Sequence, residues 1–266
     1  MASTGDFQRR IIGSFYFIPL FLGIMSGFPY AAVAGGAAIM WLAFEASLIL
    51  TGALRTKRAA LMWLFLILPY PLAFVSLSGS LIILIWLILY GGVHYLNRWR
   101  EAGFLGLLML ASISLGMILS KQNGHLVLLC LATVISAGDI GAYLFGRLFG
   151  GPKLAPSISP SKTWTGAFGG LICSLVAVCI LSFVLDVSLL EPAGWVSAVM
   201  VSVLAQLGDL FESRVKRRLG IKDSGSFVPG HGGALDRFDG YLSVLPLVFV
   251  SDFIHYTPFW LKISAS

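Results

Sequence analysis

Long apolar segments follow one another through almost the whole chain. A helix needs about 20 apolar residues to cross a hydrocarbon layer of roughly 30 Å. About nine segments approach that length, at residues 11–27, 29–53, 59–77, 80–96, 104–120, 125–146, 164–185, 194–213 and 241–260. Charged residues make up only 11% of the chain, whereas a soluble domain has about 25%. The pattern predicts an all-α polytopic membrane protein with about nine transmembrane helices.

The first apolar segment has two features of a signal peptide. It follows Arg9 and Arg10, and small residues come soon after it. However, the hydrophobic character continues through those small residues as a second segment. We therefore expect a retained membrane anchor rather than a cleaved leader.

The positions of lysine and arginine predict the orientation, because cytoplasmic connections carry the excess of positive charge. With a cytoplasmic N-terminus, all but two of the 18 basic residues fall in cytoplasmic connections, and the exceptions are Lys121 and Lys262. The net charge of +6 then suits a surface that faces anionic lipid. Nothing in the pattern indicates a nucleic-acid partner.

The two halves of the chain differ in their polar content. Up to about residue 120 the only acidic residue in a predicted span is Glu45, so residues 1–120 are interpreted as scaffold helices. Further on, Asp139 and Asp209 enter the spans, at a cost of roughly 2.5–3.5 kcal/mol each. We expect one membrane domain, 1–266, whose catalytic half is 125–260 with cytoplasmic loops 147–163 and 214–240.

The stretch from Gly208 to Arg218 places polar residues on one helix face. Counted from Asp209, the polar residues Glu212, Ser213 and Lys216 lie three, four and seven positions further along the chain. Residues with this spacing share one face of a helix. The alternative interpretation is a stop-transfer cluster whose acids and bases pair at the interface. That alternative explains the basic residues better than Asp209, which lies inward of them.

The connection from Lys222 to Gly240 is a polar island rich in glycine. If a helix starts near Ala234, Asp236 and Asp239 project from its first turn, beside Asp209. Carboxylates together with substrate phosphates are typical ligands of Mg²⁺, so Asp209, Asp236 and Asp239 are predicted to bind it, and a second cation stays open. The glycines would let backbone N–H groups approach a phosphate.

Two smaller features accompany these acids. His231, between the glycines, is a candidate contact to phosphate or nucleotide, and the alternative is a loop histidine bonded to the backbone. Lys162 adds a positive charge, and the hydroxyls of Ser161 and Thr163 precede a predicted helix whose N-terminus favours an anion. The alternative there is a simple helix cap. No Walker, GxGxxG, HExxH or GxSxG pattern occurs.

The stretch "SRVKRRLGIKDSGSFVPGHGGALDRFDG", Ser213 to Gly240, resembles the signature of the phosphatidate cytidylyltransferase family. The earlier stretch "GDIGAYLFGRLFGGPKLAPSISPSKTWTG" is also similar to that family. Together these stretches cover about residues 137–242. Ser161, Thr165 and Gly240 depart from the family pattern, which leaves their individual roles open.

The resemblance implies transfer of the cytidylyl group from CTP to phosphatidic acid, giving CDP-diacylglycerol and pyrophosphate, with Mg²⁺ required. It implies Asp209 and Asp236 as first metal ligands, with Asp239 and Asp139 as further ligands or as anchors for bases. The expected catalytic and triphosphate-binding bases are Lys216, Arg217, Lys222 and Arg237. The other expected substrate-binding residues are Ser159, Lys162, Thr163, Ser213, Asp223, His231, Gly232 and Gly233.

The same residues leave alternatives open. A related enzyme could use CTP on an archaeal-type ether-lipid phosphate. A transporter for an anionic solute would also place acids in spans, although it predicts a repeat with interrupted helices in both halves. A structural protein has no reason to bury Asp139 and Asp209. We expect the protein in the inner membrane of a bacterium, with an active site that faces the cytoplasm and with membrane lipids as partners. A homodimer is one option, and the oligomeric state stays open.

Overall fold

The computed structural model describes residues 17–51, 63–64, 66–74, 99–221, 223–225 and 232–253. The chain divides into two compact units. The first unit is Met1–Ser120 with Val215–Asp239, and the second unit is Lys121–Arg214 with Gly240–Ser266. The predicted single membrane domain and its division near residue 120 stay predictions.

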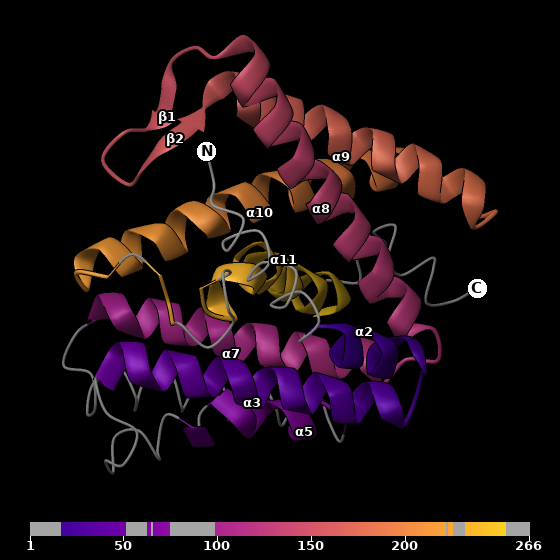
Figure 1. The fold of residues 1–266 in the computed structure, drawn as a ribbon. Helices are drawn as coiled ribbons and strands as arrows, with labels where there is room; N and C mark the ends of the chain where they lie inside the picture. The colour runs from indigo at the N-terminus through magenta and orange to yellow at the C-terminus, as the bar shows by residue number, and fades with distance from the viewer. Residues whose placement is uncertain are drawn as a thin grey trace. The chain divides into compact units, whose positions relative to one another are not determined.

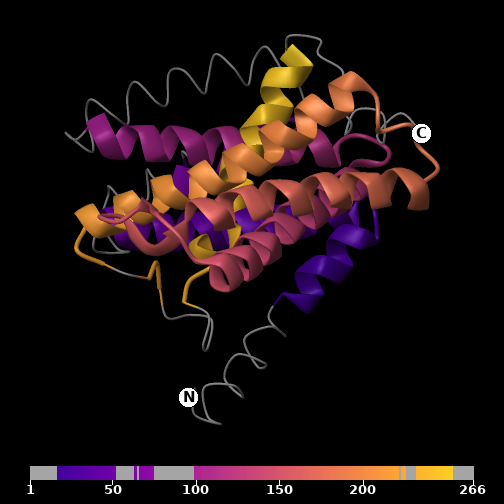
Figure 2. The same ribbon diagram turned by 90° about the horizontal axis from the view of Figure 1, so that it is seen from above.

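The first unit contains α2 (Ile18–Met25), α3 (Tyr30–Thr51), α5 (Pro69–Leu72) and α7 (Trp99–Leu119). In Figure 1, α3 and α7 lie side by side, and α5 packs against α7. The view from above shows α2 at an angle to α3 (Figure 2). Two hydrogen bonds tie these helices together: Tyr70 donates to the carbonyl of Ala32 at 2.7 Å, and buried Ser112 to that of Leu66 at 2.9 Å. Polar groups inside this unit are thus satisfied between helices, as burial requires.

The second unit is built around α8 (Gly124–Phe149) and α9 (Trp164–Val184), which pack against each other. Between them the chain forms β1 (Lys153–Ala155) and β2 (Ser159–Thr163), seen as a projecting hairpin in Figure 1. The long helix α10 (Pro192–Arg218) belongs to this unit up to Arg214. The helix α11 (Leu235–Phe253) belongs to it from Gly240 onward.

Four helices are long and apolar enough to cross a membrane, namely Tyr30–Leu50, Gly124–Phe149, Trp164–Val184 and Pro192–Arg218. They coincide with four predicted spans and make the chain a mostly helical polytopic membrane protein. The predicted number of nine is not confirmed. The described residues form eight helices, of which α2 and α5 have only 8 and 4 residues. The predicted span 80–96 lies outside the described residues.

The hairpin corrects the expectation that the fold is all-α. β1 and β2 are antiparallel, with Lys153 opposite Thr163 and Ala155 opposite Ser159. Pro156 begins the turn between them, in which the N–H of Ile158 donates to the carbonyl of Ala155 at 3.1 Å. Prolines disfavour helix in this connection, and extended backbone allows the two short segments to pair with each other.

Glycines let α8 and α9 touch backbone to backbone. A Cβ atom at Gly141 would lie 2.7 Å from the carbonyl oxygen of Gly169, and one at Gly170 would lie 2.8 Å from that of Gly138. Small residues at a helix interface are the common way for membrane helices to approach this closely. The contact fixes α8 and α9 as one rigid pair.

We expect Gly141→Ala to destabilise the protein by about 1–3 kcal/mol, because the added methyl group overpacks this contact. The matched control is Gly103→Ala in α7, where a Cβ would meet nothing within 4 Å. There the change should stabilise the helix by about 0.5–1 kcal/mol. Thermal unfolding in detergent measures both variants. Equal stability of the two would contradict the tight α8–α9 contact.

Candidate active site

A cavity of about 440 Å³ lies in the second unit. It is lined from α8, the hairpin, the start of α9 and α10. Its charged lining residues are Asp139, Arg147, Lys162 and Asp209. The structure therefore brings together two of the predicted acids and one of the predicted bases.

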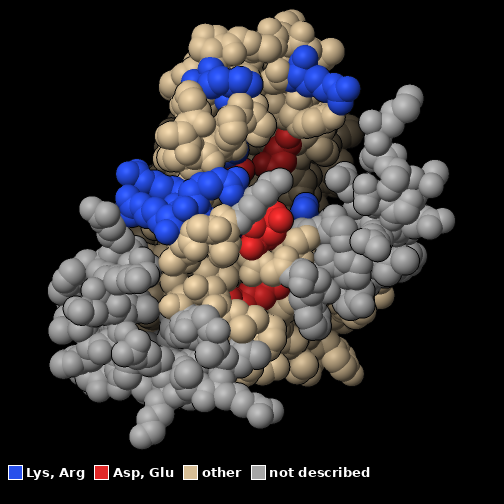
Figure 3. Space-filling view, turned by 60° about the vertical axis from the view of Figure 1, so that its left-hand side comes forward, with Lys and Arg blue, Asp and Glu red and all other residues tan. Residues whose placement is uncertain are grey.

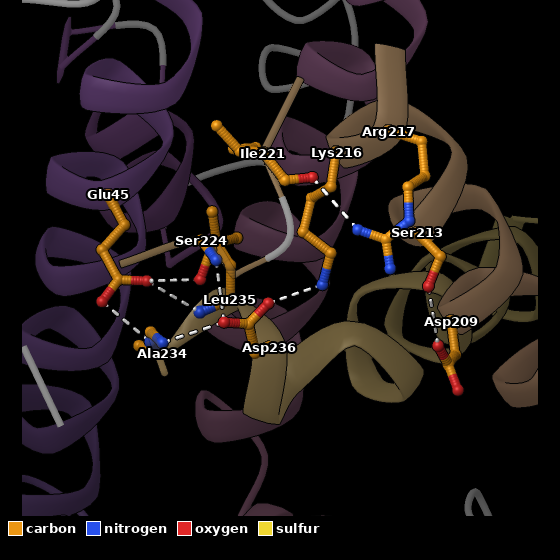
Figure 4. Close-up of polar contacts among 11 residues, drawn as sticks. Glu45, Asp209, Ser213, Lys216, Arg217, Ile221, Ser224, Ala234, Leu235 and Asp236 are labelled. Atoms are coloured by element: carbon orange, nitrogen blue, oxygen red, sulfur yellow. Dashed lines mark hydrogen bonds and ion pairs between the residues drawn. The ribbon is translucent and has the colours of Figure 1, made fainter. Parts of the chain in front are cut away.

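Asp209 forms an ion pair with Lys162 in this cavity. Lys162 comes from β2 and Asp209 from α10, so the pair joins segments far apart in the sequence. The two side chains are 24% and 36% exposed, which leaves them accessible to a ligand. The Ser213 hydroxyl lies 3.4 Å from Oδ1 of Asp209 and donates to it (Figure 4). A carboxylate can accept about four hydrogen bonds, so Asp209 retains acceptor capacity.

The α8 side of the cavity carries a row of polar groups one turn apart. Asp139, Tyr143 and Arg147 follow at intervals of four residues and line the cavity together. Arg147 donates to the Tyr143 hydroxyl at 2.6 Å, which leaves the other N–H groups of its guanidinium to bind an anion. Asp139 lies within the candidate span Gly124–Phe149, as predicted, and its side chain is exposed and lines this cavity.

The start of α9 confirms the simpler interpretation of Thr163. Thr163 is the N-cap of α9, and its hydroxyl accepts a hydrogen bond from the N–H of Gly166 at 3.1 Å. Thr165, where the family pattern differs, donates to the carbonyl of Gly150 and so ties the end of α8 to the start of α9. Ser161 lines the cavity. Substrate contacts by Thr163 and Ser159 stay predictions.

In the first unit, Asp236 accepts three hydrogen bonds. Lys216 Nζ lies 2.5 Å from Oδ1, and the backbone N–H groups of Ser224 and Gly233 donate to Oδ2 at 2.8 and 2.9 Å. The side chains of Lys216 and Asp236 are only 12% and 11% exposed. Figure 4 shows the lysine reaching Asp236 from the end of α10.

These contacts set the charge of Asp236. Burial alone raises the pKa of a carboxyl group, but here the hydrogen bonds from Lys216, Gly233 and Ser224 outweigh it. With the positive charge of Lys216 they lower the pKa of Asp236 below its ordinary value. Asp236 is therefore ionised at neutral pH.

The start of α11 confirms one local prediction. The helix begins at Leu235, next to the predicted Ala234, and Asp236 lies in its first turn. Asp239 follows in the same helix and is half-buried, whereas Arg237 is exposed. Convergence of Asp236 and Asp239 with Asp209 stays a prediction.

The remaining predicted residues are placed as follows. Arg217 donates to the carbonyl of Ile221 at 3.2 Å, and Asp223 is exposed. Gly232 has a φ of +77°, which is the conformation that favours glycine, and Gly233 is buried. Lys222 and His231 lie outside the described residues.

Besides Arg147, sequence reasoning missed two further residues. Gln206 lines the cavity and donates to the carbonyl of Ala167 at 3.3 Å; its position three residues before Asp209 on the same helix could have indicated it. Glu45, interpreted only as part of the scaffold, is buried and accepts hydrogen bonds from the start of α11. An ionisable residue within a membrane span is the signal that could have found it.

The cavity residues fit a magnesium ion. Asp139 and Asp209 line the same cavity, and Mg²⁺ is usually held by one or two carboxylates plus phosphates and water. No group of three or more His, Cys, Asp or Glu within the described residues could hold a metal by itself. A magnesium site therefore stays a prediction, and so does the three-carboxylate set of Asp209, Asp236 and Asp239.

Basic side chains are concentrated at the C-terminal end of α10. Its last turn carries Lys216, Arg217 and Arg218. Figure 3 shows a continuous group of Lys and Arg side chains on one face of the molecule. Positive charge at a helix C-terminus is favourable in itself, and it also provides a surface for anions.

Comparison with known proteins matches residues 8–255 to the model of the cytidylyltransferase family. A phosphatidate cytidylyltransferase of Staphylococcus haemolyticus is 41% identical over 174 residues, which are 64% of this chain and 66% of that relative, just under two thirds of its length. One of Staphylococcus epidermidis is 38% identical over 179 residues, 65% of this chain and 68% of the relative. One of Brucella suis is 36% identical over 204 residues, 71% of each chain.

The range matched by the family model extends over nearly the whole sequence and includes both stretches on which the resemblance rests. The polar residues of the cavity and of the α10–α11 connection lie within this range. The chain therefore belongs to the cytidylyltransferase family.

Proposed function

We propose that this protein transfers the cytidylyl group of CTP to phosphatidate and forms CDP-diacylglycerol and pyrophosphate. The observation that carries the proposal is the cavity in which Asp139 and Asp209 lie with Lys162 and Arg147. It is built on α8, α9 and α10, which are candidate membrane spans. Family membership and the names of the relatives support the same reaction.

The reaction requires little acid–base chemistry. A phosphate oxygen of phosphatidate attacks the α-phosphorus of CTP and forms a new P–O bond. The bond between the α-phosphorus and the bridging oxygen breaks, and pyrophosphate leaves with that electron pair. Since phosphatidate is already an anion, the protein has to hold two anions in line and offset their repulsion.

The cavity offers groups for that task. Lys162 and Arg147 would bind phosphate oxygens, and binding would draw Lys162 away from its ion pair with Asp209. Asp209 and Asp139 would hold Mg²⁺, which supplies positive charge to the triphosphate when it is bound. Gln206 and Tyr143 would orient the ligand by hydrogen bonds. A second cation is part of the same proposal.

For the first unit, the roles predicted from the sequence for Lys216, Asp236, Asp239, Arg217 and Arg237 are part of the proposal. In this proposal Lys216 and the arginines bind the triphosphate. The diacylglycerol tails stay in the bilayer and the phosphate head group meets CTP at the cytoplasmic face of the inner membrane. An exposed apolar stripe on α9 supports contact with lipid, and it comprises Phe168, Ile172, Val176, Ile180 and Phe183.

An assay with purified protein in detergent tests the proposal. CTP, phosphatidate and Mg²⁺ should give CDP-lipid and pyrophosphate in equal amounts, and chelation of Mg²⁺ should stop the reaction. Replacing phosphatidate by an ether-lipid phosphate in a parallel reaction tests the related enzyme class. No product from phosphatidate would overturn the proposed function. Vesicles that take up an anionic solute without forming CDP-lipid would indicate a transporter instead.

A further inference from the structure

A buried carboxylate in α3 binds the start of α11. Glu45 is only 2% exposed and lies within the candidate span Tyr30–Leu50. Oε1 accepts hydrogen bonds from the N–H of Ala234 at 2.8 Å and from the indole N–H of Trp41 at 3.2 Å. Oε2 accepts from the N–H of Leu235 at 3.0 Å and from the Ser224 hydroxyl at 3.2 Å. Glu45 therefore joins three sequence segments of the first unit.

All four of these neighbours are donors. Two of them are backbone N–H groups at the first residues of α11, where a helix has unpaired donors and a partial positive charge. Four hydrogen bonds fill the acceptor capacity of a carboxylate, which compensates for its burial. An ionised carboxylate fits this position, and a group that must donate does not.

Glu45 and Asp236 hold the same backbone from two sides. Ser224 donates its hydroxyl to Glu45 and its backbone N–H to Asp236. Gly233 donates to Asp236, while Ala234 and Leu235 donate to Glu45. Figure 4 shows both carboxylates directed at this backbone, with Lys216 on the far side of Asp236. The direction of Asp236 thus depends on where Glu45 holds the helix start.

We propose that Glu45 is a positioning residue for the cytidylyl transfer, acting through Asp236 and Lys216. The inference rests on the proposed function. Glu45 fixes the first turn of α11, and that turn sets the place of the Asp236 carboxylate and of the ammonium group bound to it. Glu45 itself touches no substrate. Its role would be to keep a charged pair in one geometry during the reaction.

Glu45→Gln weakens the hold of residue 45 on the first turn of α11 and changes the shape of the side chain least. Whichever way the amide is oriented, its NH₂ group faces at least one backbone N–H, of Ala234 or of Leu235. We expect kcat to fall on the order of 10- to 100-fold, as for other supporting residues around a charged site. KM for CTP should rise by a smaller factor than kcat falls, because Lys216 is displaced but Lys162 and Arg147 are untouched. Glu45→Asp should restore part of kcat.

Hydrogen–deuterium exchange provides a readout that does not depend on activity. In Glu45→Gln the amides of residues 233–237 should exchange about tenfold faster, the factor that one lost hydrogen bond gives. The amides of α8 and α9 should be unchanged. The matched control is Ser112→Ala, which loses a buried hydrogen bond of the same unit to Leu66 and should leave kcat and this exchange as in wild type.

Gly233→Ala gives a second route if Glu45→Gln does not fold. A Cβ at Gly233 would meet the Ser224 hydroxyl and lie 2.9 Å from Cδ of Glu45. It would therefore displace the Glu45 carboxylate and the Ser224 hydroxyl without removing any hydrogen-bond donor or acceptor. The same fall in kcat and the same faster exchange are expected.

The outcomes separate this inference from the proposed function. Wild-type kcat and wild-type exchange in Glu45→Gln would overturn the inference. Faster exchange with unchanged kcat would also overturn it, since Glu45 would then be only structural. An inactive wild type would overturn the proposed function, and the positioning inference would fall with it.

Discussion

Asp209→Asn should lower the rate of CDP-lipid formation by at least about 100-fold, a loss comparable to removing one preorganised charged group from other active sites. Asparagine keeps the shape of the side chain but loses the charge that pairs with Lys162 and that would bind Mg²⁺ in the proposed function. The loss should be mainly in kcat, and added Mg²⁺ should restore only part of it. Steady-state rates at several Mg²⁺ concentrations measure both effects.

The matched control is Asp186→Asn, the same chemical change in the same unit. Asp186 follows α9, outside the residues that line the cavity, with a φ of +52°. Asparagine adopts that conformation readily, so the control should keep wild-type rates and stability. Activity of Asp209→Asn within a few-fold of the control would contradict a role of Asp209 in the reaction.

Asp236→Asn should destabilise the protein strongly. It leaves Lys216, only 12% exposed, without its carboxylate, and breaking a buried pair from one side costs about 3 kcal/mol or more. Activity should fall as well, because the start of α11 loses its tie to α10. Thermal unfolding and CDP-lipid formation by the same detergent sample separate the two effects.

The pH dependence of stability gives a second test of this pair. The pKa of Asp236 in the folded protein is lower than its ordinary value of 3.8. A carboxyl group with a lowered folded pKa stabilises the protein above its unfolded pKa, and this stability is lost as the pH falls through the folded value. Wild type should therefore lose stability below about pH 4 more steeply than Asp236→Asn does.

A double variant distinguishes the ion pair from the other contacts of Asp236. Lys216→Met combined with Asp236→Asn removes both charges, so no unpaired charge stays buried. The double variant should be more stable than Asp236→Asn alone. Strict additivity of the two single effects would contradict direct coupling between Lys216 and Asp236.

Prediction from the sequence was most successful for elements whose structure depends on local residues alone. The predicted spans that begin at residues 29, 125, 164 and 194 coincide with helices. Their apolar segments are so long that a membrane-spanning helix is the structure they favour. The helix start near Ala234 followed from the glycines before it and the acids after it. The cap at Thr163 was one of two interpretations, and a hydroxyl before a helix favours it on local grounds.

The contacts that join distant segments could not be predicted in this way. Nothing in the local pattern of α3 indicates that Glu45 binds residues about 190 positions further along the chain. The hairpin was missed because two short polar segments pair only in the context of the turn between them. Asp139 was predicted within a span, but its position beside Lys162 and Asp209 in one cavity could not be predicted. Contacts between distant segments depend on tertiary packing, and the periodicity of the sequence carries no information about it.

The close contact between α8 and α9 also limits how a lipid can reach the cavity. Where Gly138 and Gly141 face Gly170 and Gly169, even a methyl group has no room, so an acyl chain cannot pass between these two helices. Under the proposed function, the two-tailed substrate would therefore have to enter along another side of the second unit. The contacting glycines would exclude the hydrocarbon tails from this side, while the head group would bind at the end where α8, the hairpin and α9 meet.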